Sequence, residues 1–278
     1  MTDTGSGGPG VGAAGALRGD RRGVSEVLGF VLVFGLVLSS VGIVYVAGQQ
    51  GLQDARDFER VNNAERAFDV LADNVDDVAR DSAPSRATEL KLADAGLSVD
   101  EPTVVNVTAA HPTTAAKSMT TEYEVSPLVY EADGGSQVVY SNGAVLRSER
   151  EGAVVTRQPD LVLDDGDADE MRTDRAIIPV VATRPARDAG TNVAGSTTVL
   201  VRTERATERV FVTERDETEP YHLYLNVTTP RTDAWERYLE DATPNADDCS
   251  VDGDTVECDV EGVERVYVTV VEIDVSIE

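Results

Sequence analysis

Histidine is the side chain from which a hydrolytic or metal-dependent site is most often built, and this sequence has two of them. His111 precedes a proline in a predicted loop, and His222 lies at the start of a predicted strand. Neither belongs to a zinc-binding or nucleophile-elbow pattern, and no glycine-rich phosphate loop is present. We therefore expect no enzyme activity, no catalytic residue and no cofactor. A membrane-tethered hydrolase is the weakest alternative.

Carboxylates crowd the run 164–170, with a density typical of a Ca²⁺-binding loop. Counted from Asp165, the sixth position holds Glu170 where such a loop needs glycine. The twelfth holds Ala176 where it needs a bidentate glutamate. We favour a hydrated acidic loop over a calcium site and predict no metal.

The two cysteines, Cys249 and Cys258, flank a segment that contains the turn-forming pair Asp252-Gly253. A hairpin that turns there places the flanking cysteines opposite each other. A disulfide is the favoured interpretation for a segment outside the cell. Two buried free thiols are the alternative.

Two tripeptides have the N-glycosylation pattern, Asn106-Val107-Thr108 and Asn226-Val227-Thr228. Asn106 and Asn226 are therefore predicted glycosylation sites. Both lie in strand-like runs, so accidental occurrence of the pattern is an equal alternative.

Near the N-terminus, an apolar run at 27–47 holds 21 positions without a charge. As a helix it is about 31 Å long, close to the hydrocarbon thickness of a bilayer. It is apolar all round from Val27 to Ser39, which disfavours a buried helix of a soluble core. Arg18, Arg21 and Arg22 precede it, so we expect a single-pass protein of the cell membrane with a cytoplasmic N-terminus and an extracellular C-terminal domain.

The segment Arg22-Gly23-Val24-Ser25-Glu26-Val27-Leu28-Gly29 resembles the class III signal peptide of archaeal type IV pilins and archaellins. Residues 62–74 and 83–88 are also similar to an uncharacterised pilin-like family of haloarchaeal membrane proteins. The resemblance implies processing by a prepilin peptidase at Arg22, Gly23 and Val24, with the cut between Gly23 and Val24. It also implies an assembly role for Glu26, which would pair with the new amino terminus of a neighbouring pilin-like subunit. In this sequence Glu26 is the third residue after the cut, whereas the bacterial pattern has its glutamate at the fifth.

The charge is strongly acidic: 51 Asp and Glu against 24 Lys and Arg give a formal net charge of −27. Lys91 and Lys117 are the lysines, and arginine supplies the other basic residues. This composition is typical of halophilic proteins, in which molar salt screens the self-repulsion. With no basic patch outside the leader, a nucleic-acid partner is not expected.

The sequence divides into four predicted segments: a disordered leader at 1–23, a transmembrane helix at 24–48, an amphipathic helix at 49–82 and an acidic β-rich extracellular domain at 83–278. Within the transmembrane helix, Gly35, Ser39 and Gly42 fall on one face that another helix could approach closely, and chance spacing is the alternative. The amphipathic pattern runs over 52–81, from Leu52 through Phe58, Phe68 and Val78.

The remainder alternates apolar and polar residues in short runs. We predict strands at 88–99, 103–108, 121–131, 137–141, 145–156, 176–183, 197–202, 209–215, 221–228 and 271–277, and a short helix at 233–240. The expected fold is α+β: a long N-terminal helix followed by an antiparallel sandwich- or barrel-like domain. The expected function is that of a pilin-like cell-surface protein, a structural component such as a minor pilin. The alternative is a membrane-anchored extracellular binding module that does not polymerise.

Overall fold

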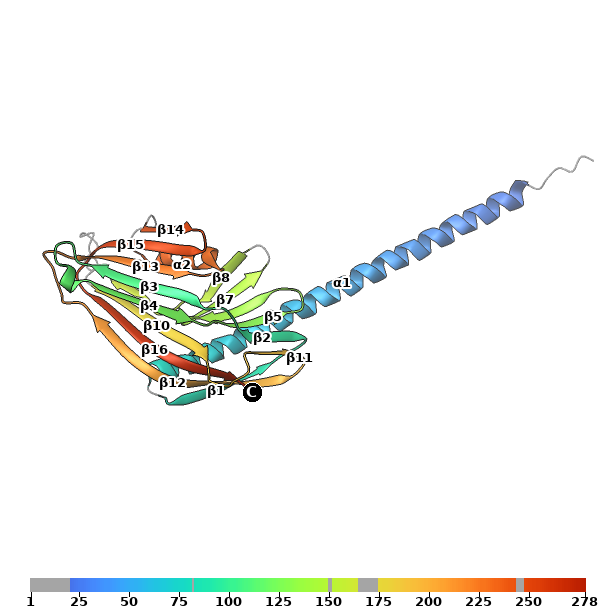
Figure 1. The fold of residues 1–278 in the computed structure, drawn as a ribbon. Helices are drawn as coiled ribbons and strands as arrows, with labels where there is room; N and C mark the ends of the chain where they lie inside the picture. The colour runs from blue at the N-terminus through green and yellow to red at the C-terminus, as the bar shows by residue number, and fades with distance from the viewer. Residues whose placement is uncertain (1–20, 82, 150–151, 165–174, 244–247) are drawn as a thin grey trace, which may run out of the picture. The chain divides into compact units, whose positions relative to one another are not determined.

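The computed structural model describes residues 21–81, 83–149, 152–164, 175–243 and 248–278 (Figure 1). It confirms an α+β fold with one long N-terminal helix followed by a β-rich domain with antiparallel sheets. The chain divides into two units, Met1–Asp54 and Ala55–Glu278. The acidic run 165–170, where a calcium loop was considered, and the leader 1–20 lie outside the described residues.

The first element is α1 (Arg21–Ala79), a single helix that continues across Gly48 and Gly51. This confirms the predicted long N-terminal helix, in which the apolar segment continues into the amphipathic segment. It ends at Ala79, three residues before the predicted end at 82 and five before Pro84, which disfavours helical backbone in the residue before it.

Within unit 2, α1 buries one stripe of apolar side chains. Phe68, Leu71 and Val75 are fully buried, and Val61 is 3% exposed. Phe58, which continues the same stripe toward the N-terminus, is 57% exposed. The predicted amphipathic stripe is thus buried only from Val61 onward, where the apolar cluster shared with the sheets begins.

The described strands form three sheets. The first has the order β1 (Ser85–Lys91), β12 (Thr198–Val212), β16 (Val266–Ile277), β10 (Arg175–Pro185), β9 (Val162–Asp164). The second has the order β11 (Asn192–Gly195), β2 (Ala95–Val99), β5 (Leu128–Ala132), β6 (Gln137–Ser141), β7 (Ala144–Glu149), β8 (Gly152–Arg157). The third has the order β14 (Cys249–Asp252), β15 (Thr255–Val263), β13 (Tyr221–Thr228), β3 (Thr103–Ala110), β4 (Met119–Val125). Two short helices complete the described elements, η1 (Ala115–Lys117) and α2 (Thr232–Ala242).

The strand predictions were right in kind and wrong in several boundaries. The predicted strand 88–99 is two strands, β1 and β2, because the chain turns at Asp94 with a φ of 55°. The two predicted strands at 197–202 and 209–215 are one long strand, β12, whose register shifts between Arg205 and Thr207. The pairing of β10 with β16 is parallel, which a purely antiparallel domain does not contain.

Two clusters of buried side chains hold the sheets together. One cluster joins the α1 stripe to residues of the first and second sheets, including Tyr140 and Ile273. The other joins the third sheet and α2 to the opposite faces of the first two sheets, with Trp235 of α2 only 2% exposed. Asp233, in the first turn of α2, accepts a hydrogen bond from the Ala153 N–H of β8 at 2.8 Å. Through this hydrogen bond and further contacts, α2 packs against β8 at the edge of the second sheet.

Candidate functional site

In unit 1, the apolar part of α1 is exposed along its whole length. Every residue from Glu26 to Gln49 is exposed, and the large apolar side chains from Val27 to Val46 keep between 48% and 72% of their accessible surface. Among the residues that the structure describes, α1 is the one helix long and apolar enough to cross a membrane. Its length and composition make it a candidate membrane span.

The residues of the predicted processing site begin this helix. Arg22, Gly23 and Val24 belong to α1 by backbone, and their side chains lie outside the described residues. Glu26 is exposed near the helix N-terminus. Processing at Gly23 and an assembly role for Glu26 remain predictions.

Gly35, Ser39 and Gly42 share an exposed face of α1. A Cβ atom added at Gly35 or Gly42 meets nothing within 4 Å, so this face is open in the single chain. Helix packing at these three residues also remains a prediction.

The disulfide prediction is confirmed. Cys249 of β14 and Cys258 of β15 are direct partners in the antiparallel register, and their sulfurs are bonded at 2.09 Å. The turn between the strands contains Gly253 with a φ of +63°, which suits glycine. Both cysteines are buried in the cluster that includes α2, so the bond ties the edge of the third sheet to the core.

The two predicted glycosylation sites lie side by side, which the sequence did not indicate. Asn106 of β3 and Asn226 of β13 are direct partners in the antiparallel register of the third sheet. Each is half-buried and alternates with fully buried neighbours, so both side chains lie on the outer face of that sheet.

A group of polar side chains that sequence analysis did not find joins two loops of unit 2. Asp216 lies between β12 and β13, while His111 and Lys117 lie between β3 and β4. Lys117 Nζ donates to Asp216 Oδ2 at 2.7 Å, and His111 Nε2 lies 3.2 Å from the same oxygen. The other carboxylate oxygen accepts from the backbone N–H groups of Thr218 and Glu219 at 3.1 and 2.9 Å.

His111, Asp216 and Glu219 bring three possible metal ligands within 4.8 Å of one another. The hydrogen bonds oppose a metal at this position. His111 Nδ1 accepts from the N–H groups of Thr113 and Thr114, so the proton of the neutral ring is on Nε2, the nitrogen that faces Asp216. The Lys117 ammonium already supplies a positive charge there. The group is therefore suited to holding the loops together, and it offers neither a metal site nor a free nucleophile.

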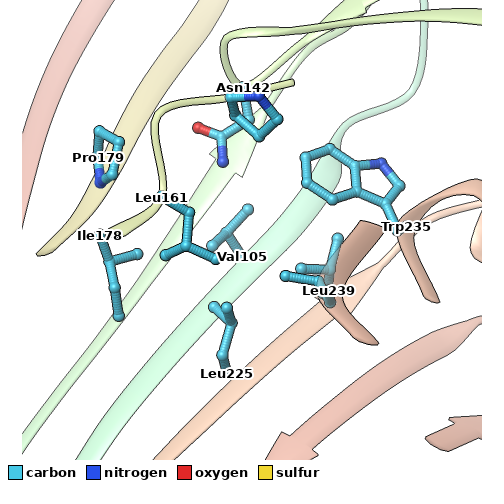
Figure 2. Close-up of a pocket in the computed structure, with 10 residues that line it drawn as sticks. Val105, Asn142, Leu161, Ile178, Pro179, Leu225, Trp235 and Leu239 are labelled. Atoms are coloured by element: carbon cyan, nitrogen blue, oxygen red, sulfur yellow. The ribbon is translucent and has the colours of Figure 1, made fainter. Parts of the chain in front are cut away.

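The cavity in Figure 2 is a space of about 20 Å³, enough for roughly one water molecule. Its lining comes from β3, β10, β13, α2 and the segments beside them, and it is mostly aliphatic, with Val105, Ile178 and Leu225 facing Trp235 and Leu239 (Figure 2). The Asn142 side chain is the polar group at one end, and its Oδ1 accepts from the Val181 N–H at 2.8 Å. Ligand sites of ordinary size are more than ten times larger. The cavity is a packing gap of the core.

The sequence model of a family of unknown function, DUF7289, matches residues 22–276. The chain belongs to this family. No curated protein and no solved structure matches the chain.

The DUF7289 match includes both the exposed apolar part of α1 and almost all of unit 2. The apolar helix is therefore part of the DUF7289 pattern together with the β-rich domain. Of the predicted site residues, the structure brings together Cys249 with Cys258 and Asn106 with Asn226.

Proposed function

We propose that this protein is a single-pass membrane protein that holds an acidic, sandwich-like β domain at the outer surface of an archaeal cell. The observation that carries the proposal is the exposure of α1 from Glu26 to Gln49. Burying apolar surface stabilises by about 25 cal/mol per Å². A helix of this composition therefore needs an apolar environment, and a bilayer has the required thickness.

The proposed orientation has the N-terminus in the cytoplasm. Arg18, Arg21 and Arg22 precede the apolar run, and arginines near a membrane span stay on the cytoplasmic side. The Cys249–Cys258 disulfide supports an outer location for unit 2, because disulfides persist in oxidising surroundings. The net charge of −27 fits a surface exposed to concentrated salt.

Within this location, we propose a structural role as a pilin-like component, such as a minor pilin. The support is the resemblance of residues 22–29 to a class III signal. Its implied partners are a prepilin peptidase and other pilin-like subunits. After processing, the Val24 amino group of one subunit would pair with Glu26 of another at the edge of the bilayer.

The deciding experiment is N-terminal sequencing of protein purified from its native membranes. We expect the chain to start at Val24, and Gly23→Phe to abolish this start because the peptidase needs a small residue before the cut. The matched control is Gly19→Phe, which adds the same side chain outside the site and should be processed normally. A chain that keeps Met1 or Thr2 contradicts the pilin-like role.

A membrane-anchored binding module that does not polymerise is the second candidate. Both candidates account for the burial of Phe68, Leu71 and Val75 under the sheets of the same chain, so Glu26 is the residue that separates them. Under this alternative, Glu26→Ala changes neither membrane insertion nor assembly. Under the pilin-like proposal, the same variant inserts normally and forms no filaments.

A further inference from the structure

The outer face of the third sheet places the two asparagines of the glycosylation patterns in one row. Across strands β4, β3, β13 and β15, the row consists of Glu122, Asn106, Asn226 and Glu257 in direct register. Each asparagine therefore has the other on one side and a glutamate on its far side. The two positions have the same pattern in sequence and the same half-buried class, but different contacts.

The first difference is in hydrogen bonding. Asn106 Nδ2, the atom that would be modified, donates to Glu122 Oε2 at 3.1 Å. The Asn106 amide oxygen accepts from Thr108 Oγ1 at 3.4 Å. Within the part of the chain that the structure describes, the Asn226 side-chain amide makes no hydrogen bond, so a substituent on its nitrogen breaks none.

The second difference is the neighbour two residues earlier on the same strand face. For Asn226 this is Tyr224, a residue that is 38% exposed. For Asn106 it is Val104. A sugar ring has an apolar face of C–H groups that stacks on the negative face of an aromatic ring, so Tyr224 offers a packing surface that Val104 does not.

We propose that Asn226 is an N-glycosylation site of this protein and that Asn106 stays unmodified in the folded chain. Directly opposite side chains in an antiparallel sheet have Cβ atoms about 4.5–5.5 Å apart. This spacing leaves no room for two branched sugars between Glu122 and Glu257, so one glycan excludes the other.

The modification uses a glycan carried on a polyprenyl phosphate or diphosphate. A bond forms between Asn226 Nδ2 and the anomeric carbon of the first sugar. The bond from that carbon to the phosphate oxygen breaks, and the lipid phosphate leaves with the electron pair. The amide proton passes to a base of the transferase. The inference rests on the proposed outer location of unit 2, because the acceptor must meet the lipid-linked donor outside the cytoplasm.

The test is intact-mass measurement and glycopeptide mapping of the full chain from its native membranes. We expect one glycan, at Asn226. Thr108→Ala and Thr228→Ala are a matched pair, since each removes the third position of one pattern and leaves its asparagine. Thr108→Ala should retain the glycan and Thr228→Ala should lose it. Thr228→Ser should regain it, which separates loss of the acceptor from failure to fold. A glycan on Asn106, on both residues or on neither overturns the inference.

Protease treatment of intact cells separates this failure from failure of the proposed function. If external protease cleaves unit 2 and no glycan is found at Asn226, only the glycosylation inference is wrong. If unit 2 is protected in intact cells and cleaved after lysis, the proposed outer location is wrong, and the glycosylation inference fails with it.

Discussion

At the residue scale, Asp216 joins two loops of unit 2 through several polar contacts. Its carboxylate accepts from Lys117, from two backbone N–H groups and from Thr218 Oγ1, and it faces His111 Nε2. The hydrogen bond from Lys117, with those from Glu219 N–H and His111, holds the pKa of the Asp216 carboxyl well below its usual range. The ionised form is therefore favoured by folding.

This shift gives a pH dependence of stability with a definite sign. A carboxyl whose pKa is lower in the folded state than in the unfolded state stabilises the fold above its unfolded pKa, which is about 3.9 for aspartate. That contribution is lost as the pH falls below this value toward the folded-state pKa. We expect acidification from about pH 5 to pH 2 to destabilise wild-type protein more than Asp216→Asn, whose side chain does not titrate.

The measurement for this prediction is the thermal midpoint as a function of pH in molar salt. At pH 7, Asp216→Asn should melt at a lower temperature than wild type, since its amide presents a donor to Lys117 or His111. The exposed Glu101 is the control, and Glu101→Gln should match wild type at pH 7. A pH profile for Asp216→Asn as steep as that of wild type would falsify the assignment.

Residue-level prediction from sequence succeeded where the partners are close along the chain. Cys249 and Cys258 are nine residues apart around a turn signal, so the hairpin and the disulfide follow from local rules. His111 and Asp216 are separated by 105 residues, and Lys117 and Asp216 by 99. No local pattern reports contacts between such distant loops. The pairing of Asn106 with Asn226 was hidden for the same reason.

At the element scale, the period of the apolar residues predicted α1 correctly, but it did not show where the helix becomes covered. Phe58 and Phe68 occupy the same stripe, and one is 57% exposed while the other is fully buried. The difference depends on which sheet residues reach the helix, and several of those residues, such as Tyr140 and Ile273, come from strands far along the chain. The pairing of β10 with β16 could not be predicted from the sequence either. Parallel strands need a long connection, and the sequence does not specify its path.

The burial of the α1 stripe predicts a large effect of Phe68→Ala. Removing a buried phenylalanine costs about 3–5 kcal/mol, from lost transfer free energy and the cavity left behind. Val70 is two positions away on the same helix and 52% exposed, so Val70→Ala should change the free energy of unfolding by less than about 0.5 kcal/mol. Denaturant unfolding of both variants in detergent and molar salt measures the difference. Equal shifts for the two variants would contradict the packing of α1 against the sheets.

At the scale of the whole molecule, the ion pairs of unit 2 follow from its arginine-rich composition. Arg157 of β8 contacts two α1 carboxylates, Asp73 at 2.6 Å and Asp76 at 2.9 Å, and donates to the Asp69 carbonyl at 3.1 Å. Burial raises the pKa of Asp76 even though Arg80 and Arg157 oppose the change. A planar guanidinium can satisfy several acceptors at once, whereas a lysine ammonium acts as a single point charge. Arginine therefore suits the attachment of α1 to the second sheet in a chain with 51 acidic residues.

The partition of the whole molecule between membrane and water depends on the apolar part of α1. Val37 and Val41 lie one helical turn apart in the apolar part of α1, and they are 48% and 60% exposed. An arginine near the centre of a membrane span costs about 2.5–3.5 kcal/mol, so Val37→Arg with Val41→Arg costs roughly 5–7 kcal/mol of insertion free energy. We expect this double variant to be released from the membrane pellet by alkaline carbonate while wild type is retained. Asn63→Arg with Val70→Arg adds the same charge at exposed positions of α1 in unit 2, and it should stay in the pellet.

If both double variants partition like wild type, α1 does not hold the chain in the bilayer by its apolar segment. If both are released, added charge alone explains the loss, and the span assignment has no support from this experiment.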